Sequence, residues 1–166
     1  MTSSSPRKPP IIAWTTRKPP FGGEALLRWK HPSAGFLYPP LVIALAREDH
    51  FLDELGLLLI EQACRDFKRL EEACPVPLDI SVNITPDQLN RPDFTGEVQK
   101  RLRAYRIPKG RLGFEITEQV ALSSSTAVHQ RLLELREMGL QVIMDDFGMG
   151  HGSMAYLQNA EFSIVK

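Results

Sequence analysis

Five carboxylate and amide side chains stand at or near the ends of apolar, strand-like segments, where they could do chemistry together. Asn83 comes late in PLDISVNI, Glu115 late in RLGFEIT, and Asp145 and Asp146 late in LQVIMDDF. Glu24 lies in GGEALLRW, a segment that we expect to neighbour them. Because ligands of parallel α/β folds bind beyond the carboxyl ends of the strands, we expect these side chains to converge there.

A cluster of this kind predicts a bound cation. Carboxylates packed together raise one another's pKa unless a positive charge neutralises them. Oxygen ligands without His or Cys favour Mg²⁺ or Mn²⁺ over zinc. The neighbouring Asp145 and Asp146 could hold two ions, the arrangement that activates water in phosphoester hydrolysis. Arg28, four residues after Glu24, could clamp a phosphate oxygen, and its alternative is an ordinary surface salt bridge.

The strand-like segments alternate with amphipathic stretches, which is the pattern of βα units around a parallel sheet. The predicted strands cover residues 11–14, 23–29, 78–84, 112–117, 141–147 and 162–166. The linker 16–22 is short and rich in turn residues, so we expect the first two strands to form an antiparallel hairpin.

Three stretches are predicted helices. Residues 52–73 carry a helical stripe of apolar side chains, namely Leu55, Leu58, Leu59, Ala63 and Phe67. Thr85 is a candidate N-cap before Pro86, so a helix should begin directly after the third strand. Residues 123–138 form the third helix, which ends before Gly139 at a position that suits glycine.

Composition indicates a globular domain with a real core, since 43% of the 166 residues are hydrophobic and 24% charged. Lysine plus arginine and aspartate plus glutamate both total 20, so we expect neither nucleic acid nor an anionic membrane as partner. Cys64 and Cys74 lack metal-site spacing and favour free thiols in a reducing cytoplasm. Residues 1–9 are predicted to be a disordered tail, and no segment is apolar enough to span a membrane.

These elements predict an α/β fold of the TIM-like (β/α) barrel type with an antiparallel first strand. A complete eight-stranded barrel takes roughly 250 residues, so we expect an incomplete barrel with about six of the eight strands. The last segment, FSIVK, resembles a central buried strand, which would leave an apolar edge unless something covers it.

The segments GGEALLRWKHP, SVNITPDQL, FEITE and DDFGMGHGSMAYL, in this order, resemble the EAL-domain cyclic di-GMP phosphodiesterases. The resemblance covers residues 10–166, which we interpret as a partial EAL domain. It implies an α/β barrel that uses two Mg²⁺ or Mn²⁺ ions to hydrolyse one phosphodiester bond of cyclic di-GMP, giving linear pGpG. It also implies a homodimer that forms through the region after DDFG.

The resemblance also assigns residue roles by motif. The implied metal ligands are Glu24, Asn83, Glu115 and Asp145 for one ion, with Asp145 and Asp146 for the second. Arg28 and Leu26, in the EALLR motif, are similar to substrate-binding residues. The implied catalytic residues are Glu24, Glu118 and Lys166. Glu118 is similar to the glutamate that steadies the loop after DDFG, and Lys166 resembles the lysine near the attacking water.

The chain also departs from the family pattern. Pro9 replaces a substrate-contacting glutamine, and Met149, His151 and Gly152 replace a threonine, an aromatic residue and a serine after DDFG. Family elements that follow Lys166, including a later glutamate ligand, lie beyond this sequence. We therefore expect weak or no hydrolysis by this chain alone. The alternatives are a non-catalytic cyclic di-GMP receptor or protein-interaction module, and a fragment with little stable structure.

Overall fold

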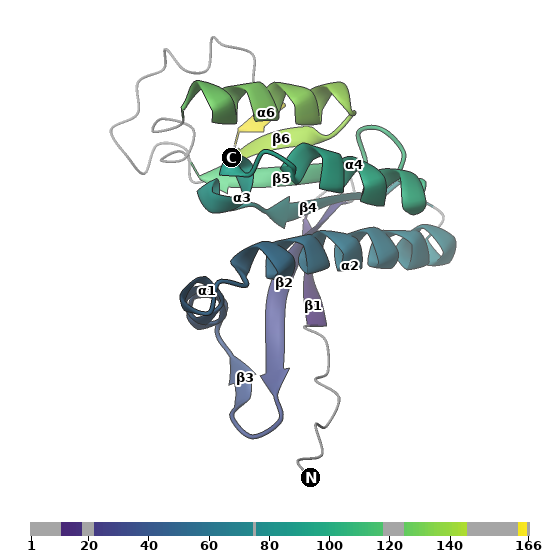
Figure 1. The fold of residues 1–166 in the computed structure, drawn as a ribbon. Helices are drawn as coiled ribbons and strands as arrows, with labels where there is room; N and C mark the ends of the chain where they lie inside the picture. The colour runs from purple at the N-terminus through teal and green to yellow at the C-terminus, as the bar shows by residue number, and fades with distance from the viewer. Residues whose placement is uncertain (1–10, 18–21, 75, 118–124, 146–162, 166) are drawn as a thin grey trace.

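The computed structural model describes residues 11–17, 22–74, 76–117, 125–145 and 163–165 (Figure 1). The strands are β1 (Ile11–Arg17), β2 (Gly22–His31), β3 (Gly35–Leu37), β4 (Asp79–Asn83), β5 (Leu112–Thr117), β6 (Gln141–Asp145) and β7 (Ile164–Val165). The helices are α1 (Pro39–Glu48), α2 (Leu52–Ala73), α3 (Pro86–Asn90), α4 (Phe94–Ala104) and α6 (Thr126–Glu137). The predicted tail and the segment after Asp145 that contains DFG lie outside the described residues.

The described strands form one sheet in the order β1-β2-β4-β5-β6-β7, with β3 paired to β2 off this path. β1 pairs with β2 antiparallel, which confirms the predicted hairpin. All later neighbours, from β2·β4 to β6·β7, are parallel. Within the described residues the sheet does not close on itself, because β1 and β7 are its two ends. The fold is therefore α/β with an incomplete barrel, as predicted.

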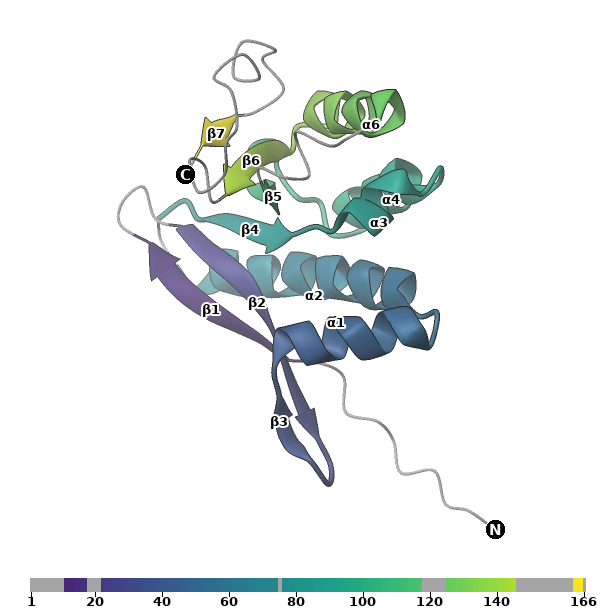
Figure 2. The same ribbon diagram turned by 90° about the vertical axis from the view of Figure 1, so that its left-hand side faces the viewer.

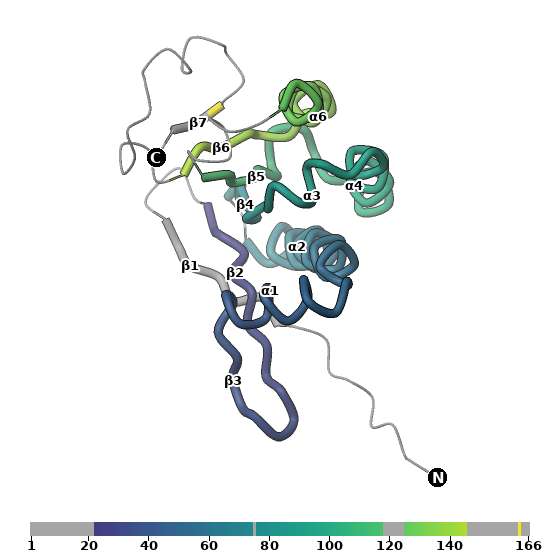
Figure 3. The backbone as a smooth tube through the Cα atoms, turned by 60° about the vertical axis from the view of Figure 1, so that its left-hand side comes forward, coloured from purple at the N-terminus to yellow at the C-terminus, as the bar shows by residue number. Residues whose placement is uncertain are grey.

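The main core lies on one face of the sheet, where α2, α4 and α6 cover it (Figure 3). Successive side chains of a strand point to opposite faces, so each strand gives alternate residues to this core. The core side chains of β4, β5 and β6 are Ile80, Val82, Leu112, Phe114, Ile116, Val142 and Met144. The intervening residues lie on the opposite face, and the polar side chains of the predicted site are among them.

A second, smaller core joins β2 to α1 and the start of α2. Leu27 of β2 packs there with Val42 and Ala46 of α1 and with Leu52 and Leu55 of α2. This cluster fixes α1 beside the part of β2 that extends past the end of β4 (Figure 2). Among the described helices, none combines the length and the hydropathy that a membrane span requires.

The helix boundaries confirm the capping predictions. Thr85 caps α3 in a capping box: its side chain accepts from the backbone N–H of Gln88, whose side chain accepts from the backbone N–H of Thr85 at 2.8 Å. Gly139 follows α6 with a φ of +92°, a conformation that glycine adopts without strain. Both features are local, which is why the sequence reveals them.

Two of the sequence-based predictions were wrong or incomplete. Leu58 is 41% exposed, whereas Leu55, Gly56, Ile60 and Cys64 carry the buried side of α2. The buried side of this helix is therefore centred away from Leu58. β3, α1 and α4 were not predicted at all.

Candidate functional site

The register of the sheet places the predicted residues on one face. Glu24 on β2 is the partner of Ser81 on β4, and Asn83 on β4 is the partner of Glu115 on β5. Thr117 on β5 is the partner of Asp145, the last residue of β6. The next positions on these strands belong to the main core, so all of these side chains belong to the opposite face. The site thus crosses four neighbouring parallel strands and follows the sheet edge formed by β2 and the carboxyl-terminal parts of β4, β5 and β6.

Glu24 and Asn83 contact each other directly across β2 and β4. The side-chain amide of Asn83 donates a hydrogen bond to Oε1 of Glu24 at 2.8 Å. Glu24 is half-buried and Asn83 is exposed, so both side chains can be reached from solvent. This pairing brings together two residues that are far apart in sequence, as predicted. Asn83 ends β4, but Glu24 is the third residue of β2, so its predicted strand-end position was wrong; it reaches Asn83 because β2 extends past the end of β4.

Glu115 is the most deeply buried acid of the described site, with only 1% of its surface exposed. The hydroxyl of Ser81, itself 6% exposed, donates a hydrogen bond to Oε1 of Glu115. A buried carboxylate is costly unless hydrogen bonds or a cation compensate for the lost hydration. Ser81 was missed from the sequence, although it stands two residues before Asn83 and therefore on the same strand face.

Arg28 and Leu26 continue the same face along β2. Ala25 and Leu27 are buried in the two cores, so the alternation puts Leu26 and Arg28 on the side of Glu24. Nη1 of Arg28 donates to the carbonyl of Leu27 at 2.8 Å, and no carboxylate of the described residues forms an ion pair with Arg28. The surface salt-bridge alternative for Arg28 therefore has no support in the described part of the chain.

The donor set suits a hard cation, since carboxylate and amide oxygens are the ligands that Mg²⁺ and Mn²⁺ prefer. The structure brings Glu24 to Asn83 and places Glu115 and Asp145 along the same edge. No group of three His, Cys, Asp or Glu side chains positioned to hold a metal occurs among the described residues. Asp146, Glu118 and Lys166 lie outside the described residues, so the complete ligand set stays a prediction.

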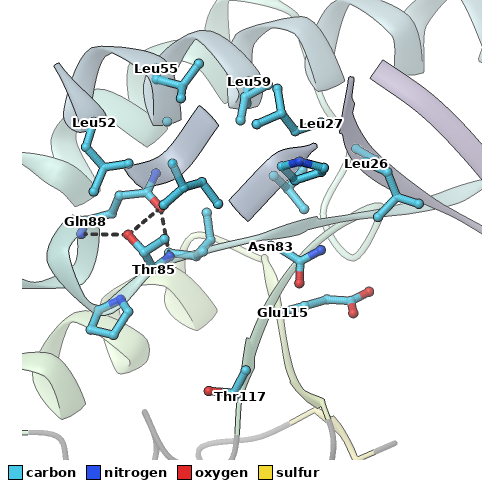
Figure 4. Close-up of a pocket in the computed structure, with 17 residues that line it drawn as sticks. Leu26, Leu27, Leu52, Leu55, Leu59, Asn83, Thr85, Gln88, Glu115 and Thr117 are labelled. Atoms are coloured by element: carbon cyan, nitrogen blue, oxygen red, sulfur yellow. Dashed lines mark hydrogen bonds between the residues drawn. The ribbon is translucent and has the colours of Figure 1, made fainter. Parts of the chain in front are cut away.

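A pocket of about 350 Å³ adjoins this edge, between β2, α1, α2 and α3 (Figure 4). Its polar side carries Asn83, Glu115 and Thr117. Its apolar side is lined by leucines, namely Leu26, Leu27, Leu52, Leu55 and Leu59. A pocket with one polar and one apolar side suits an organic ligand that carries charge at one end.

Gln88 fixes the wall of this pocket at the start of α3. It is 4% exposed and closes the capping box with Thr85, as the dashed lines in Figure 4 show. Nearby, Nη2 of Arg47 in α1 lies 2.8 Å from Oδ2 of Asp87 in α3. This ion pair is exposed and contributes little to stability, but it connects the two helices that flank the pocket.

The buried thiol of Cys64 is not a candidate nucleophile. Cys64 is a free cysteine with no exposed surface, and burial raises its pKa from 9.0 to about 12. A thiol with such a pKa stays protonated at neutral pH, and the thiolate is the reactive form.

Comparison with known proteins gives a consistent picture. The family model described as "EAL domain" matches residues 9–166. The chain is 34% identical over 145 residues to "Probable cyclic di-GMP phosphodiesterase PdeN" of Escherichia coli, covering 87% of this chain and 28% of that protein. It is 34% identical over 143 residues to "Cyclic di-GMP phosphodiesterase NbdA" of Pseudomonas aeruginosa, covering 86% and 18%.

Solved structures agree with the sequence relatives. The PaMucR phosphodiesterase in complex with c-di-GMP superposes with a TM-score of 0.84 at 26% identity, covering 94% of this chain and 64% of that one. The chain therefore spans less than a third of the length of these two curated relatives and 64% of the matched structure.

Proposed function

Because this chain belongs to the EAL domain family, we propose that it is a divalent-metal-dependent phosphodiesterase that converts cyclic di-GMP to linear pGpG. The observation that carries the proposal is the set of oxygen side chains along one sheet edge, in which Asn83 is hydrogen-bonded to Glu24 and Glu115 is buried beside them. Relatives named as cyclic di-GMP phosphodiesterases support the choice of substrate.

In this proposal the edge residues hold the metal. Glu24, Asn83, Glu115 and Asp145 would ligate one ion, and Asp145 with Asp146 would ligate a second. A bound Mg²⁺ or Mn²⁺ would supply Lewis acidity toward a phosphate oxygen and lower the pKa of bound water. The chain's own contribution is to hold the oxygens rigidly, and the Ser81 hydrogen bond to Glu115 serves that purpose.

Arg28 and the neighbouring pocket would hold the substrate. The guanidinium of Arg28 stands on the face of Glu24 and would bind a phosphate oxygen. Leu26 lines the apolar side of the pocket next to Asn83 and would contact the rest of the nucleotide. Glu118, as a loop-positioning residue, and Lys166, near the attacking water, complete the proposed catalytic set on the strength of the motif resemblance.

Two further parts of the proposal concern the setting of the protein. A cytoplasmic location is supported by the free thiols of Cys64 and Cys74, since such cysteines persist in a reducing compartment. Self-association through the region after DDFG (residues 145–148) rests on the family resemblance. Size-exclusion chromatography with light scattering would test the second point.

The experiment that tests the proposal is a turnover assay beside a binding titration. Purified protein is incubated with cyclic di-GMP and MgCl₂ or MnCl₂, and pGpG is quantified by chromatography. We expect slow product formation from the wild type, in keeping with the weak hydrolysis expected from the sequence, and none above background from Glu24→Gln. Glu72→Gln, which removes an exposed charge at the end of α2, is the matched control and should be as active as the wild type. Ligand binding without pGpG formation would contradict a phosphodiesterase.

A further inference from the structure

Two large aromatic side chains are exposed where β3 meets α1. Phe36 is 64% exposed and Tyr38 is 81% exposed. They stand on the β2–β3 hairpin and its exit, which project from the body of the sheet (Figures 1 and 2). Exposed aromatic groups that gather at one place mark interaction or ligand sites more often than scattered surface residues do.

These rings border a hollow that also contains Arg28. The hollow measures about 550 Å³ and is lined by Arg28, Phe36, Leu37, Tyr38 and Pro39. Arg28 therefore connects the aromatic hollow to the strand that carries Glu24. A guanidinium beside exposed rings is the combination that binds an aromatic ligand with a phosphate group.

The strand register places a second cation beside Phe36. Lys30 is the partner of Phe36 across β2 and β3, and its Nζ lies 5.8 Å from the centroid of the Phe36 ring. Lys30 is two residues after Arg28, so both belong to the face that carries Glu24. On the other face, Trp29 and Leu37 pack against the smaller core. The distance along the strand from Glu24 to Arg28 is about 13 Å.

We infer that Phe36 and Tyr38, with Arg28 and Lys30, form a base-binding subsite for the nucleotide ligand. A guanine base of cyclic di-GMP stacks on the exposed rings, while the two cations neutralise the adjoining phosphate. This inference rests on the proposed function, because it takes cyclic di-GMP as the ligand. It adds residues of the β2–β3 hairpin that set affinity for the base and that lie away from the metal-ligating edge.

The observations favour a nucleotide over a second copy of the chain as the occupant. Lys30 lies against Phe36, whereas the centres of protein interfaces are depleted of lysine. The hollow is also continuous with the face of the proposed site through Glu24, Leu26 and Arg28. One ligand can therefore stack on the rings of the hollow and place its phosphate on the face that carries Glu24.

The test is calorimetric titration of the whole chain, in Mg²⁺, with a phosphorothioate analogue of cyclic di-GMP that resists hydrolysis. The Phe36→Ala/Tyr38→Ala double variant should raise Kd by about 5-fold to 150-fold per stacked base. Phe36→Tyr and Tyr38→Phe retain the rings and should keep Kd within about twofold of the wild type. Leu58→Ala, which removes an exposed apolar side chain on α2, is the matched control and should leave Kd unchanged. Thermal unfolding with and without Mg²⁺ confirms that each variant is folded.

The outcomes separate this inference from the proposed function. If the wild type binds the analogue and the double variant binds equally well, the base-binding subsite is wrong and the proposed function stands. If the ring-retaining variants lose as much affinity as the alanine variant, stacking is not the cause and the inference is also wrong. If the wild type does not bind the analogue, both fail. A double variant that changes only the oligomeric state would assign the rings to contact between copies and overturn the inference.

Discussion

Removal of the Ser81 hydroxyl should destabilise the fold and weaken metal binding together. Ser81 is 6% exposed and Glu115 is 1% exposed, so water cannot readily replace the lost donor. A hydrogen bond to a charged group contributes about 1.5–3 kcal/mol. Since 1 kcal/mol shifts the melting temperature of a protein of this size by about 2–4 °C, Ser81→Ala should melt about 3–12 °C lower.

The same change has a second effect, because Ser81 orients a proposed metal ligand. Loss of such an outer hydrogen bond lowers metal affinity by about 10- to 100-fold. Melting curves over a Mg²⁺ titration therefore measure both effects in one assay. Ser33→Ala, at an exposed serine of the β2–β3 turn, is the control and should stay within about 0.5 kcal/mol of the wild type.

A double-mutant cycle refutes or supports this reasoning. In a Glu115→Gln background the acceptor is neutral, so Ser81→Ala should cost only about 1 kcal/mol. If Ser81→Ala costs the same in the wild-type background and in the Glu115→Gln background, the charge of the acceptor contributes nothing and the assignment of a hydrogen bond to a charged carboxylate is wrong. A Mg²⁺ dependence identical to that of the wild type would contradict the positioning role.

Three further predictions concern the frame around the site. Gly56→Ala should lower the free energy of unfolding, because the new Cβ would lie 1.9 Å from Nε2 of Gln88. Gly96→Ala meets no atom within 4 Å and should raise the free energy of unfolding by about 0.5–1 kcal/mol. Urea unfolding measures both changes. Phe114→Ala should cost about 3–5 kcal/mol in the same assay, since Phe114 is 1% exposed, and a cost below about 1 kcal/mol would contradict its place in the core. Cys64 should resist thiol reagents at pH 8 in the folded protein. The pKa of the Cys64 thiol is about 12 in the folded protein and 9.0 in the unfolded chain, so the unfolded chain loses the proton first. The stability that the buried neutral thiol contributes is therefore complete below pH 9 and falls as the pH rises toward 12. Fast labelling of Cys64 under native conditions would refute this prediction.

Many strand and helix boundaries were predictable, because they depend on the residue types of short segments. The limits of β5 match the predicted strand, α2 begins and ends where predicted, and Thr85 is the N-cap of α3, as its residue type and the following proline predicted. The strand-end position of Asn83 and the expected neighbouring of its strand with that of Glu24 predicted a contact between residues far apart in sequence, although Glu24 itself lies near the start of β2. Parallel strands bring their carboxyl ends together, so position on a strand is enough to infer a shared edge.

The remainder depended on tertiary contacts that a linear pattern does not reveal. Leu58 fits a leucine-rich stripe, but the packing of α2 is centred on Ile60 and Cys64, so Leu58 is exposed. Ser81 has the pattern of an ordinary strand residue until the register places it beside Glu115. The exposure of Phe36 likewise follows from the projection of the hairpin, since an aromatic residue in a strand is expected to be buried.

The measurement that tests the central claim most directly is the rate of pGpG formation as a function of metal concentration. Protein stripped with EDTA should form no product from cyclic di-GMP, and added Mg²⁺ or Mn²⁺ should restore a saturable rate. Asn83→Ala should require a higher metal concentration for the half-maximal rate, because it removes a proposed ligand next to Glu24. Hydrolysis that persists without metal, or no hydrolysis at any metal concentration, would contradict the account.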